Sequence, residues 1–190
     1  DKIADKYTQQ YFNDVTDTPY IDRFLAFLPT NARVLDIGCG PGTFTKYLLK
    51  KGFNVEGIDL SSEMLRIARE KTSKAKFTLM DMRQLTYPDK SFDGLLVAYS
   101  LIHIPSDEIP LTLKGFHRII KPQGVLMIIT QKGEPDKTVD EPLKKGERIF
   151  INLFTKDRLT KFLTDAGFKV EYQEEKFMKD PDSLSDRVIY

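Results

Sequence analysis

The chain has 190 residues, 41% of them hydrophobic, which is enough for one sizeable core and is not typical of a disordered, fibrous or membrane protein. Lys and Arg number 29 and Asp and Glu 28, so no net charge attracts nucleic acid or an anionic membrane. Residues 1–6 lack the apolar core of a signal peptide, and no apolar stretch approaches the roughly 20 residues that cross a bilayer. The single cysteine, Cys39, excludes an internal disulfide. We therefore expect one cytoplasmic domain with neither nucleic-acid nor membrane partners.

Two amphipathic segments at the start of the chain, residues 3–11 and 19–28, predict helices. After them, short apolar runs alternate with longer amphipathic stretches, which is the pattern of a parallel sheet covered by helices on both faces. Strands are expected at residues 33–36, 53–58, 76–80, 92–98, 124–130, 168–177 and 185–190. Helices are expected at residues 43–50, 61–71, 107–120 and 156–166, with N-caps at Ser61, Ser106 and Thr155.

The segment 131–154 has no regular pattern and carries glycines and prolines among mixed charges. Loops of this length in compact domains are usually functional lids or disordered. The segment follows the fifth expected strand, at the edge where open α/β sheets bind ligands, so we expect a substrate lid. The single domain then divides into cap helices (1–30), a cofactor-binding core (31–130), the lid (131–154), and a C-terminal helix with strands (155–190).

A glycine-rich turn follows the first expected strand. Gly38, Gly40 and Gly42 let the backbone turn tightly and approach a ligand, and the N–H groups at the start of the next helix favour an anionic group, a phosphate or a carboxylate. The spacing is Gly-Xaa-Gly-Xaa-Gly, unlike the dinucleotide-binding Gly-Xaa-Gly-Xaa-Xaa-Gly. Asp36, at the strand end, would repel phosphates but suits the ammonium of an amino-acid moiety, directly or through water.

With these residues the sequence resembles the class I S-adenosylmethionine-dependent methyltransferases, in particular the small, single-domain, UbiE-like (type 11) members. The resemblance covers nearly the whole chain and is most specific between residues 34 and 124. It implies S-adenosyl-L-methionine as cofactor and S-adenosyl-L-homocysteine as product. The implied fold is a three-layer αβα sandwich around a Rossmann-like, mostly parallel sheet of seven strands with an antiparallel last strand.

The resemblance also implies roles for acidic residues at the ends of later strands. Asp59, about 20 residues past the glycines, is expected to accept hydrogen bonds from both ribose hydroxyls. Nicotinamide-binding proteins also have an acid at this position. Asp81, at the end of the third strand, is expected to accept from the adenine amino group. The next backbone N–H, that of Met82, is expected to bond to the adenine ring.

Apolar and backbone contacts complete the expected cofactor site. Leu60 and Met64 are expected to form apolar walls around the adenine, and the Ala98 carbonyl to accept from the methionine ammonium. The cofactor-binding residues expected from the sequence and the resemblance together are Asp36, Gly38, Gly40, Asp59, Leu60, Met64, Asp81, Met82, Ala98 and Tyr7.

Two residues are candidates for proton transfer. The methyl group of a sulfonium is already electrophilic, so the protein mainly aligns the acceptor, and a general base is needed only for an acceptor that keeps its proton. His103 follows the fourth expected strand, where an acceptor would sit, although packing or hydrogen bonding at the start of a helix is a simpler role. Tyr7 lies on the first helix, which covers the cofactor in similar proteins, and it is expected to line the methyl-transfer site.

The acceptor is expected to be a small molecule, because the sequence has neither a basic stripe nor an appended recognition domain, although a protein acceptor remains an alternative. The oligomeric state is expected to be a monomer or a homodimer. One Cys with His103 and His117 gives little support for a metal site. A second interpretation is that the chain is a nicotinamide-dependent oxidoreductase, but the glycine spacing and Asp81 argue against that function. A protein that binds S-adenosylmethionine without turnover is a third.

Overall fold

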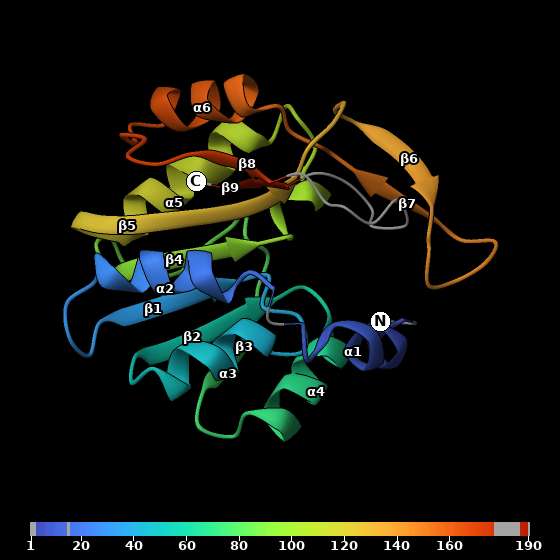
Figure 1. The fold of residues 1–190 in the computed structure, drawn as a ribbon, viewed down its shortest axis with the longest axis horizontal. Coiled ribbons are helices and arrows are strands. Elements are labelled where there is room, and N and C mark those ends of the chain that lie inside the picture. Colours follow the sequence, from blue (N-terminus) through green and yellow to red (C-terminus); the bar gives the residue numbers. More distant parts are fainter. Residues whose placement is uncertain (1–2, 15, 177–186, 190) are drawn as a thin grey trace.

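The computed structural model describes residues 3–14, 16–176 and 187–189, and its centre is a seven-stranded sheet in the order β3-β2-β1-β4-β5-β9-β8 (Figure 1). The first five of these strands along the chain pair in parallel. β9 lies between β5 and β8 and is antiparallel to both. The predicted seven-stranded, mostly parallel sheet with an antiparallel last strand is confirmed. The strands are β1 (Arg33–Ile37), β2 (Asn54–Asp59), β3 (Lys76–Leu79), β4 (Phe92–Ala98), β5 (Ile120–Gln131), β8 (Glu174–Lys176) and β9 (Arg187–Ile189).

Helices cover both faces of the sheet, so the predicted three-layer αβα arrangement is also confirmed (Figure 1). They are α1 (Ala4–Tyr11), α2 (Thr18–Ala26), α3 (Thr43–Lys50), α4 (Ser62–Lys71), α5 (Ile109–Ile119) and α6 (Lys156–Asp165). On one face Phe116 of α5 and Leu159 of α6 pack into a core that contains Leu35 of β1. On the other face Phe24 of α2 and Leu48 of α3 pack with the neighbouring Val34. Adjacent strand residues thus serve opposite faces, as expected for a sheet buried on both sides.

The helix starts follow local hydrogen bonding. The Ser61 and Thr155 hydroxyls accept from the N–H groups three residues later, 3.1 and 3.3 Å away, so both predicted N-caps are confirmed. The predicted Ser106 cap is wrong. Residues 105–108 form a turn closed by the Glu108 N–H and the Pro105 carbonyl, and α5 therefore begins only at Ile109.

The sequence predicted that the segment 131–154 is irregular, but the structure shows that part of it is regular. It contains an antiparallel pair, β6 (Lys137–Asp140) and β7 (Arg148–Ile151), in register from Lys137 opposite Ile151 to Asp140 opposite Arg148. The pair projects from the body of the molecule, at the right of Figure 1. Its strands are only four residues each; Lys137–Asp140 has a single apolar residue and Arg148–Ile151 has three in a row, so neither sequence shows apolar alternation.

Helix α1 lies beside α4 and close to the β6–β7 pair (Figure 1). Asp5 of α1 is 3.7 Å from Arg66 of α4, and the Lys6 Nζ donates to the Leu143 carbonyl in the β6–β7 loop at 3.3 Å. These contacts hold α1 across the edge of the sheet where the parallel strands end.

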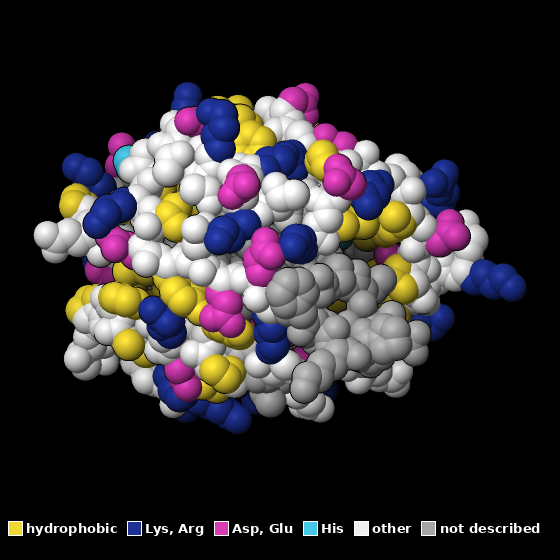
Figure 2. Space-filling view, turned by 45° about the horizontal axis from the view of Figure 1, so that its top comes forward, with side chains coloured by type: hydrophobic (Ala, Val, Ile, Leu, Met, Phe, Trp, Pro, Cys, Tyr) yellow, Lys and Arg dark blue, Asp and Glu magenta, His cyan; other side chains and the backbone are white. Residues whose placement is uncertain are grey.

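The surface in Figure 2 carries Lys and Arg interspersed with Asp and Glu, without a stripe of one sign, while a band of apolar side chains lies at its left. Across the described ranges, no helix is both long and apolar enough to span a bilayer.

Candidate cofactor and catalytic site

The parallel strands β1 to β4 end at one edge of the sheet, and most of the predicted site residues lie at these ends. The chain runs outward from β1 through β2 to β3 and then returns to the other side of β1 as β4. In open α/β sheets, ligands bind where the strand order reverses in this way. The fold thus brings together the glycine turn, Asp59, Asp81 and the residues after β4.

The glycine turn between β1 and α3 is closed by backbone hydrogen bonds. The N–H groups of Gly38 and Cys39 both donate to the Ile58 carbonyl of β2, at 2.8 and 2.9 Å. Gly38 has a φ of 71°, and a Cβ there would lie 2.2 Å from the Ser100 Cβ, so a side chain does not fit. Gly40 also has a positive φ, 52°, but a Cβ there would meet nothing within 4 Å. The turn is therefore tightly packed at Gly38 and open at Gly40, as a backbone cradle for a ligand requires.

Asp36 is almost fully buried, with 1% of its surface exposed. Its Oδ2 accepts from the Thr45 hydroxyl at 2.6 Å. Burial raises the pKa of Asp36 from 3.8 to about 7; the Thr45 hydrogen bond lowers it, and the nearby negative charge of Asp59 raises it further. A cation placed close by would stabilise the ionised carboxyl. The residue fits the ammonium of an amino-acid moiety better than it fits a phosphate.

Asp59, at the end of β2, connects the glycine turn to α4. Its Oδ2 accepts from the Gly40 N–H at 2.8 Å and its Oδ1 from the Ser61 N–H at 2.9 Å. The side chain is half-buried, and each carboxylate oxygen retains capacity for a second donor. This carboxylate can therefore still accept hydrogen bonds from a pair of vicinal hydroxyls.

Asp81, two residues past β3, forms an ion pair that the sequence analysis did not predict. Arg83 donates from Nη2 to Oδ2 at 2.6 Å and from Nε at 3.0 Å, and it also reaches Glu108 at 2.9 Å. The guanidinium holds the pKa of Asp81 below its usual value. In the sequence, the position of Arg83 two residues after Asp81 was the signal from which this ion pair could have been predicted. The neighbouring Met82 packs near the turn, where its Cε would lie 3.4 Å from a Cβ on Gly38.

Apolar side chains flank the same edge. Leu60 is 67% exposed directly after Asp59, Leu79 is 58% exposed at the end of β3, and Met64 is half-buried on α4. Leu79 pairs with Asp59, the residue before Leu60, so the two exposed apolar side chains follow neighbouring strand ends, where a bound ligand would cover them. Ala98 is half-buried at the end of β4.

Tyr7 of α1 packs over this edge. Its ring centroid is 4.8 Å from that of Tyr11. Burial raises the pKa of Tyr7 to about 12, and the charges of Tyr11 and Asp59 contribute to the rise. At neutral pH Tyr7 keeps its proton and acts as a hydrogen-bond donor.

His103 lies in the short 3-10 turn Leu101–His103 after β4, and its Nδ1 is 3.4 Å from the Phe150 carbonyl of β7. A carbonyl only accepts, so this contact requires the imidazole proton on Nδ1 and leaves Nε2 as an acceptor. The side chain is accessible, yet the protein around it removes enough water to lower the pKa of His103 below 6.5. The residue is therefore neutral at pH values where a base acts.

Asn152, which the sequence analysis missed, fixes the turn that carries His103. It is fully buried; its N–H donates to the Ile102 carbonyl at 2.7 Å and its Nδ2 to the Ile104 carbonyl at 2.8 Å. No sequence pattern marks it, because its partners lie about fifty residues away. Within residues 3–14, 16–176 and 187–189, no three His, Cys, Asp or Glu side chains are grouped to hold a metal ion.

Comparisons with known proteins agree with this geometry. A family model described as a methyltransferase domain matches residues 7–173. The chain is 37% identical over 107 residues to the putative methyltransferase YqeM of Bacillus subtilis, covering 54% of this chain and 43% of that protein. It is 32% identical over 139 residues to the ubiquinone/menaquinone biosynthesis C-methyltransferase UbiE of Rickettsia akari, covering 64% and 54%.

Among solved structures, a SAM-dependent methyltransferase from Methanosarcina mazei superposes with a TM-score of 0.79 at 24% identity, covering 90% of this chain and 95% of that one. This likeness is one of fold. The matches to YqeM and UbiE span only 43% and 54% of those proteins. The family model, in contrast, covers most of the chain. The chain therefore belongs to the methyltransferase domain family, and the family predicted from the glycine turn and the acids at the strand ends is confirmed.

Proposed function

We propose that this chain binds S-adenosyl-L-methionine and transfers its methyl group to a small-molecule acceptor. The observation that carries the proposal is Asp36, a buried carboxyl with a raised pKa directly before a glycine turn that is open at Gly40. Asp59 lies at the end of the neighbouring strand β2, and Tyr7 is on α1, which lies across the same edge of the sheet (Figure 1). The names of the related proteins, YqeM, UbiE and the Methanosarcina enzyme, support the same reaction class.

Each part of the cofactor has a matching group in this arrangement. We assign the amino-acid end to Asp36, the glycine turn and the Ala98 carbonyl, and the ribose hydroxyls to Asp59. The adenine falls to Asp81, to the Met82 N–H and to the apolar walls made by Leu60 and Met64. The cofactor supplies a methyl group on a positively charged sulfur. The protein aligns an acceptor with that bond and excludes water.

His103 is the proposed base for an acceptor that keeps its proton, through Nε2. Tyr7 is proposed to donate a hydrogen bond that orients the acceptor or the cofactor, since its pKa of about 12 makes it a poor base at neutral pH. We propose that segment 131–154 acts as the cover on the acceptor side, because its loop contacts α1 and its β7 contacts His103. The cytoplasmic location, the monomeric or homodimeric state and the lack of a nucleic-acid partner stay predictions from the sequence.

Replacing His103 with glutamine is expected to lower kcat by about 10²- to 10⁴-fold, the usual contribution of a general base. In the wild type, kcat should fall as the pH drops through a value below 6.5, where the imidazole takes up a proton. The variant should lose this inflection while its cofactor affinity stays unchanged. A pH profile of kcat in both proteins tests this, and an unchanged profile in the variant contradicts the assignment.

Isothermal titration with S-adenosyl-L-methionine tests the proposed function directly. We expect one site per chain and release of S-adenosyl-L-homocysteine when a suitable acceptor is present. A folded sample that does not bind the cofactor would overturn the proposal. Binding of a reduced nicotinamide instead would favour an oxidoreductase, and cofactor binding without product across a broad acceptor panel would favour a binding protein without turnover.

A further inference from the structure

Three segments that are far apart in the sequence meet where the β6–β7 pair joins the body of the molecule. They are residues 101–106 after β4, which we call the His103 turn, the residues next to the β6–β7 pair, and α6. The Ser106 N–H donates at 3.1 Å to Oδ1 of Asp136, which directly precedes β6. Asn152, which directly follows β7, donates to two carbonyls of the same turn. Both ends of the β6–β7 pair are therefore tied to the His103 turn.

The guanidinium of Arg158, on α6, lies at the centre of this junction. Its Nη1 donates to Oδ1 of Asn152 at 2.9 Å and to the Leu153 carbonyl at 3.0 Å. Its Nη2 donates to the Ser106 hydroxyl. Because the N–H groups of a guanidinium lie in one rigid plane, these bonds fix the His103 turn and the residues after β7 relative to each other and to α6.

The surroundings of Arg158 favour a structural link over an ion pair. The residue is half-buried, and its Cζ lies 5.1 Å from the ring centroids of both Phe154 and Phe162. Within the described residues its hydrogen-bond partners are all uncharged, and Asp136 acts on it only through its charge. A half-buried cation loses water, and here hydrogen bonds to neutral groups replace that water. These bonds are the ones that join the three segments.

We propose that Arg158 is a positioning residue for methyl transfer: it holds the β6–β7 pair against the His103 turn, so that the Phe150 carbonyl keeps the imidazole proton of His103 on Nδ1. Phe150 lies two residues before Asn152, so the bonds of Asn152 to the turn and to Arg158 set the position of its carbonyl. At 3.4 Å the contact of Nδ1 with this carbonyl is longer than most N–H···O bonds, so a small shift would break it. The inference rests on the proposed role of His103 as a base through Nε2, and Arg158 acts through the turn rather than on the reacting atoms.

The tautomer of His103 tests the proposal without a methyl acceptor or a cofactor. At about pH 8 the imidazole is neutral, and the ¹⁵N chemical shifts of the ring should show a protonated Nδ1 and an unprotonated Nε2 in the wild type. Arg158→Met keeps an unbranched side chain that can pack against the aromatic rings but donates no hydrogen bond. In this variant the Nδ1-protonated form should fall by about half or more, because the proton is then free to occupy either nitrogen.

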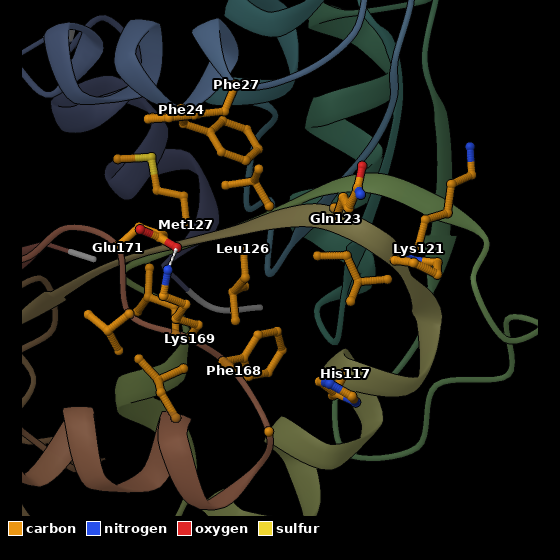
Figure 3. A pocket seen from close by; sticks show the side chains of 18 of the residues that line it. Phe24, Phe27, His117, Lys121, Gln123, Leu126, Met127, Phe168, Lys169 and Glu171 are labelled. Carbon is orange, nitrogen blue, oxygen red and sulfur yellow. Dashed lines mark ion pairs between the residues drawn. The ribbon is translucent and has the colours of Figure 1, made fainter.

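His117, the only other histidine of the chain, is the internal reference. Its ring, on α5, packs edge-on against Phe168, with the ring centroids 5.2 Å apart (Figure 3). Phe168 lies three residues past the end of α6, so a displacement of the whole helix would change the His117 shifts as well. Changed shifts at His103 with unchanged shifts at His117 therefore assign the effect to the hydrogen bonds of Arg158. Changed shifts at both histidines would overturn this assignment.

Kinetics of the Arg158 variants separate positioning from general stability. Arg158→Met should lower kcat by about tenfold or more, while its affinity for S-adenosyl-L-methionine should stay within about twofold of the wild type. Arg158→Lys keeps the charge but not the planar fork of donors, so its kcat should lie between those of the wild type and Arg158→Met. Lys161→Met removes a 76% exposed charge from the same helix. It is the matched control and should change neither kcat nor the tautomer.

Two further results would overturn the proposal. One is an Arg158→Met protein, folded by circular dichroism, in which His103 keeps the wild-type tautomer. The other is a changed tautomer with wild-type kcat while His103→Gln loses activity. If Arg158→Met does not fold, Ser106→Ala removes one acceptor of the guanidinium at a half-buried position, and an unchanged tautomer there has the same meaning.

A failure of the proposed base is a separate result. His103→Gln would then keep full activity, whereas the tautomer in Arg158→Met would still decide whether Arg158 positions the ring.

Discussion

Asp36→Asn is expected to stabilise the folded chain at neutral and alkaline pH. In the folded state the pKa of Asp36 is raised from 3.8 to about 7 by burial, so between these values the folded chain holds a proton that the unfolded chain has released. The contribution of Asp36 to the free energy of unfolding is therefore complete in acid and is lost as the pH rises through this window. A shift of about three pKa units corresponds to at most about 4 kcal/mol. Asparagine has the same shape, carries no charge and can still accept from Thr45.

Urea unfolding of the wild type and Asp36→Asn across the pH range measures this effect. The two proteins should have similar free energies of unfolding near pH 4, and the variant should be the more stable one above about pH 7. The same variant should bind S-adenosyl-L-methionine more weakly, because it has no charge for the cofactor's ammonium. A difference in stability that does not change with pH would show that Asp36 keeps an ordinary pKa.

The wild type should also release protons when it binds the cofactor near neutral pH. A cation beside Asp36 lowers its pKa, and a carboxyl that is partly protonated before binding then loses its proton. Calorimetry in buffers of different ionisation enthalpy reads the number of protons released, and Asp36→Asn is the matched control. Proton release depends on the ionisation of Asp36 and not on its packing, so this measurement tests the raised pKa of Asp36 independently of the unfolding experiment.

Asp59→Ala is expected to lower the affinity for S-adenosyl-L-methionine by roughly 100-fold or more, the equivalent of one or two lost charge-assisted hydrogen bonds. The structure adds a cost that the sequence did not predict. The Asp59 carboxylate also accepts from the N–H groups of Gly40 and Ser61, and its loss should lower the free energy of unfolding by about 1–3 kcal/mol.

Calorimetry and thermal unfolding of the Asp59 variants separate these two effects. Asp59→Asn keeps an acceptor for one N–H group, so it should recover part of the stability but little of the affinity. Glu70→Ala, an exposed acid 61% accessible on the neighbouring α4, should change neither property. An Asp59→Ala protein with wild-type affinity would remove Asp59 from the binding site.

Residues that are close in sequence explain most of what the sequence predicted correctly. β4 and α3 have the predicted bounds, β1 differs from its predicted bounds by one residue at its end, and β2 differs by one residue at each end. These elements combine a buried apolar run with a strong stop signal, and both are properties of a short stretch of chain. The glycine turn is of the same kind, because the positive φ of Gly38 and Gly40 demands a residue without Cβ.

Apart from the Ser106 cap, which a local turn displaced, the predictions that were wrong concern contacts between distant residues. The β6–β7 pair was missed because its strands are only four residues long, too short to show an apolar period. The strand expected at residues 168–177 is limited to Glu174–Lys176 in the described residues, because strand geometry needs a partner and β9 pairs only there. The expected strand at residues 185–190 is described only as β9, Arg187–Ile189.

The sequence by itself determined the alternation of strands and helices, the glycine turn, the acids at the strand ends and therefore the family. These follow from periodicity and backbone conformation, which depend on near neighbours along the chain. Only the tertiary structure decided the pKa of Asp36, the contact between His103 and Phe150, and the pairing of β6 with β7. Each depends on atoms brought together from distant positions, and loss of water and strand pairing act only once the chain has packed.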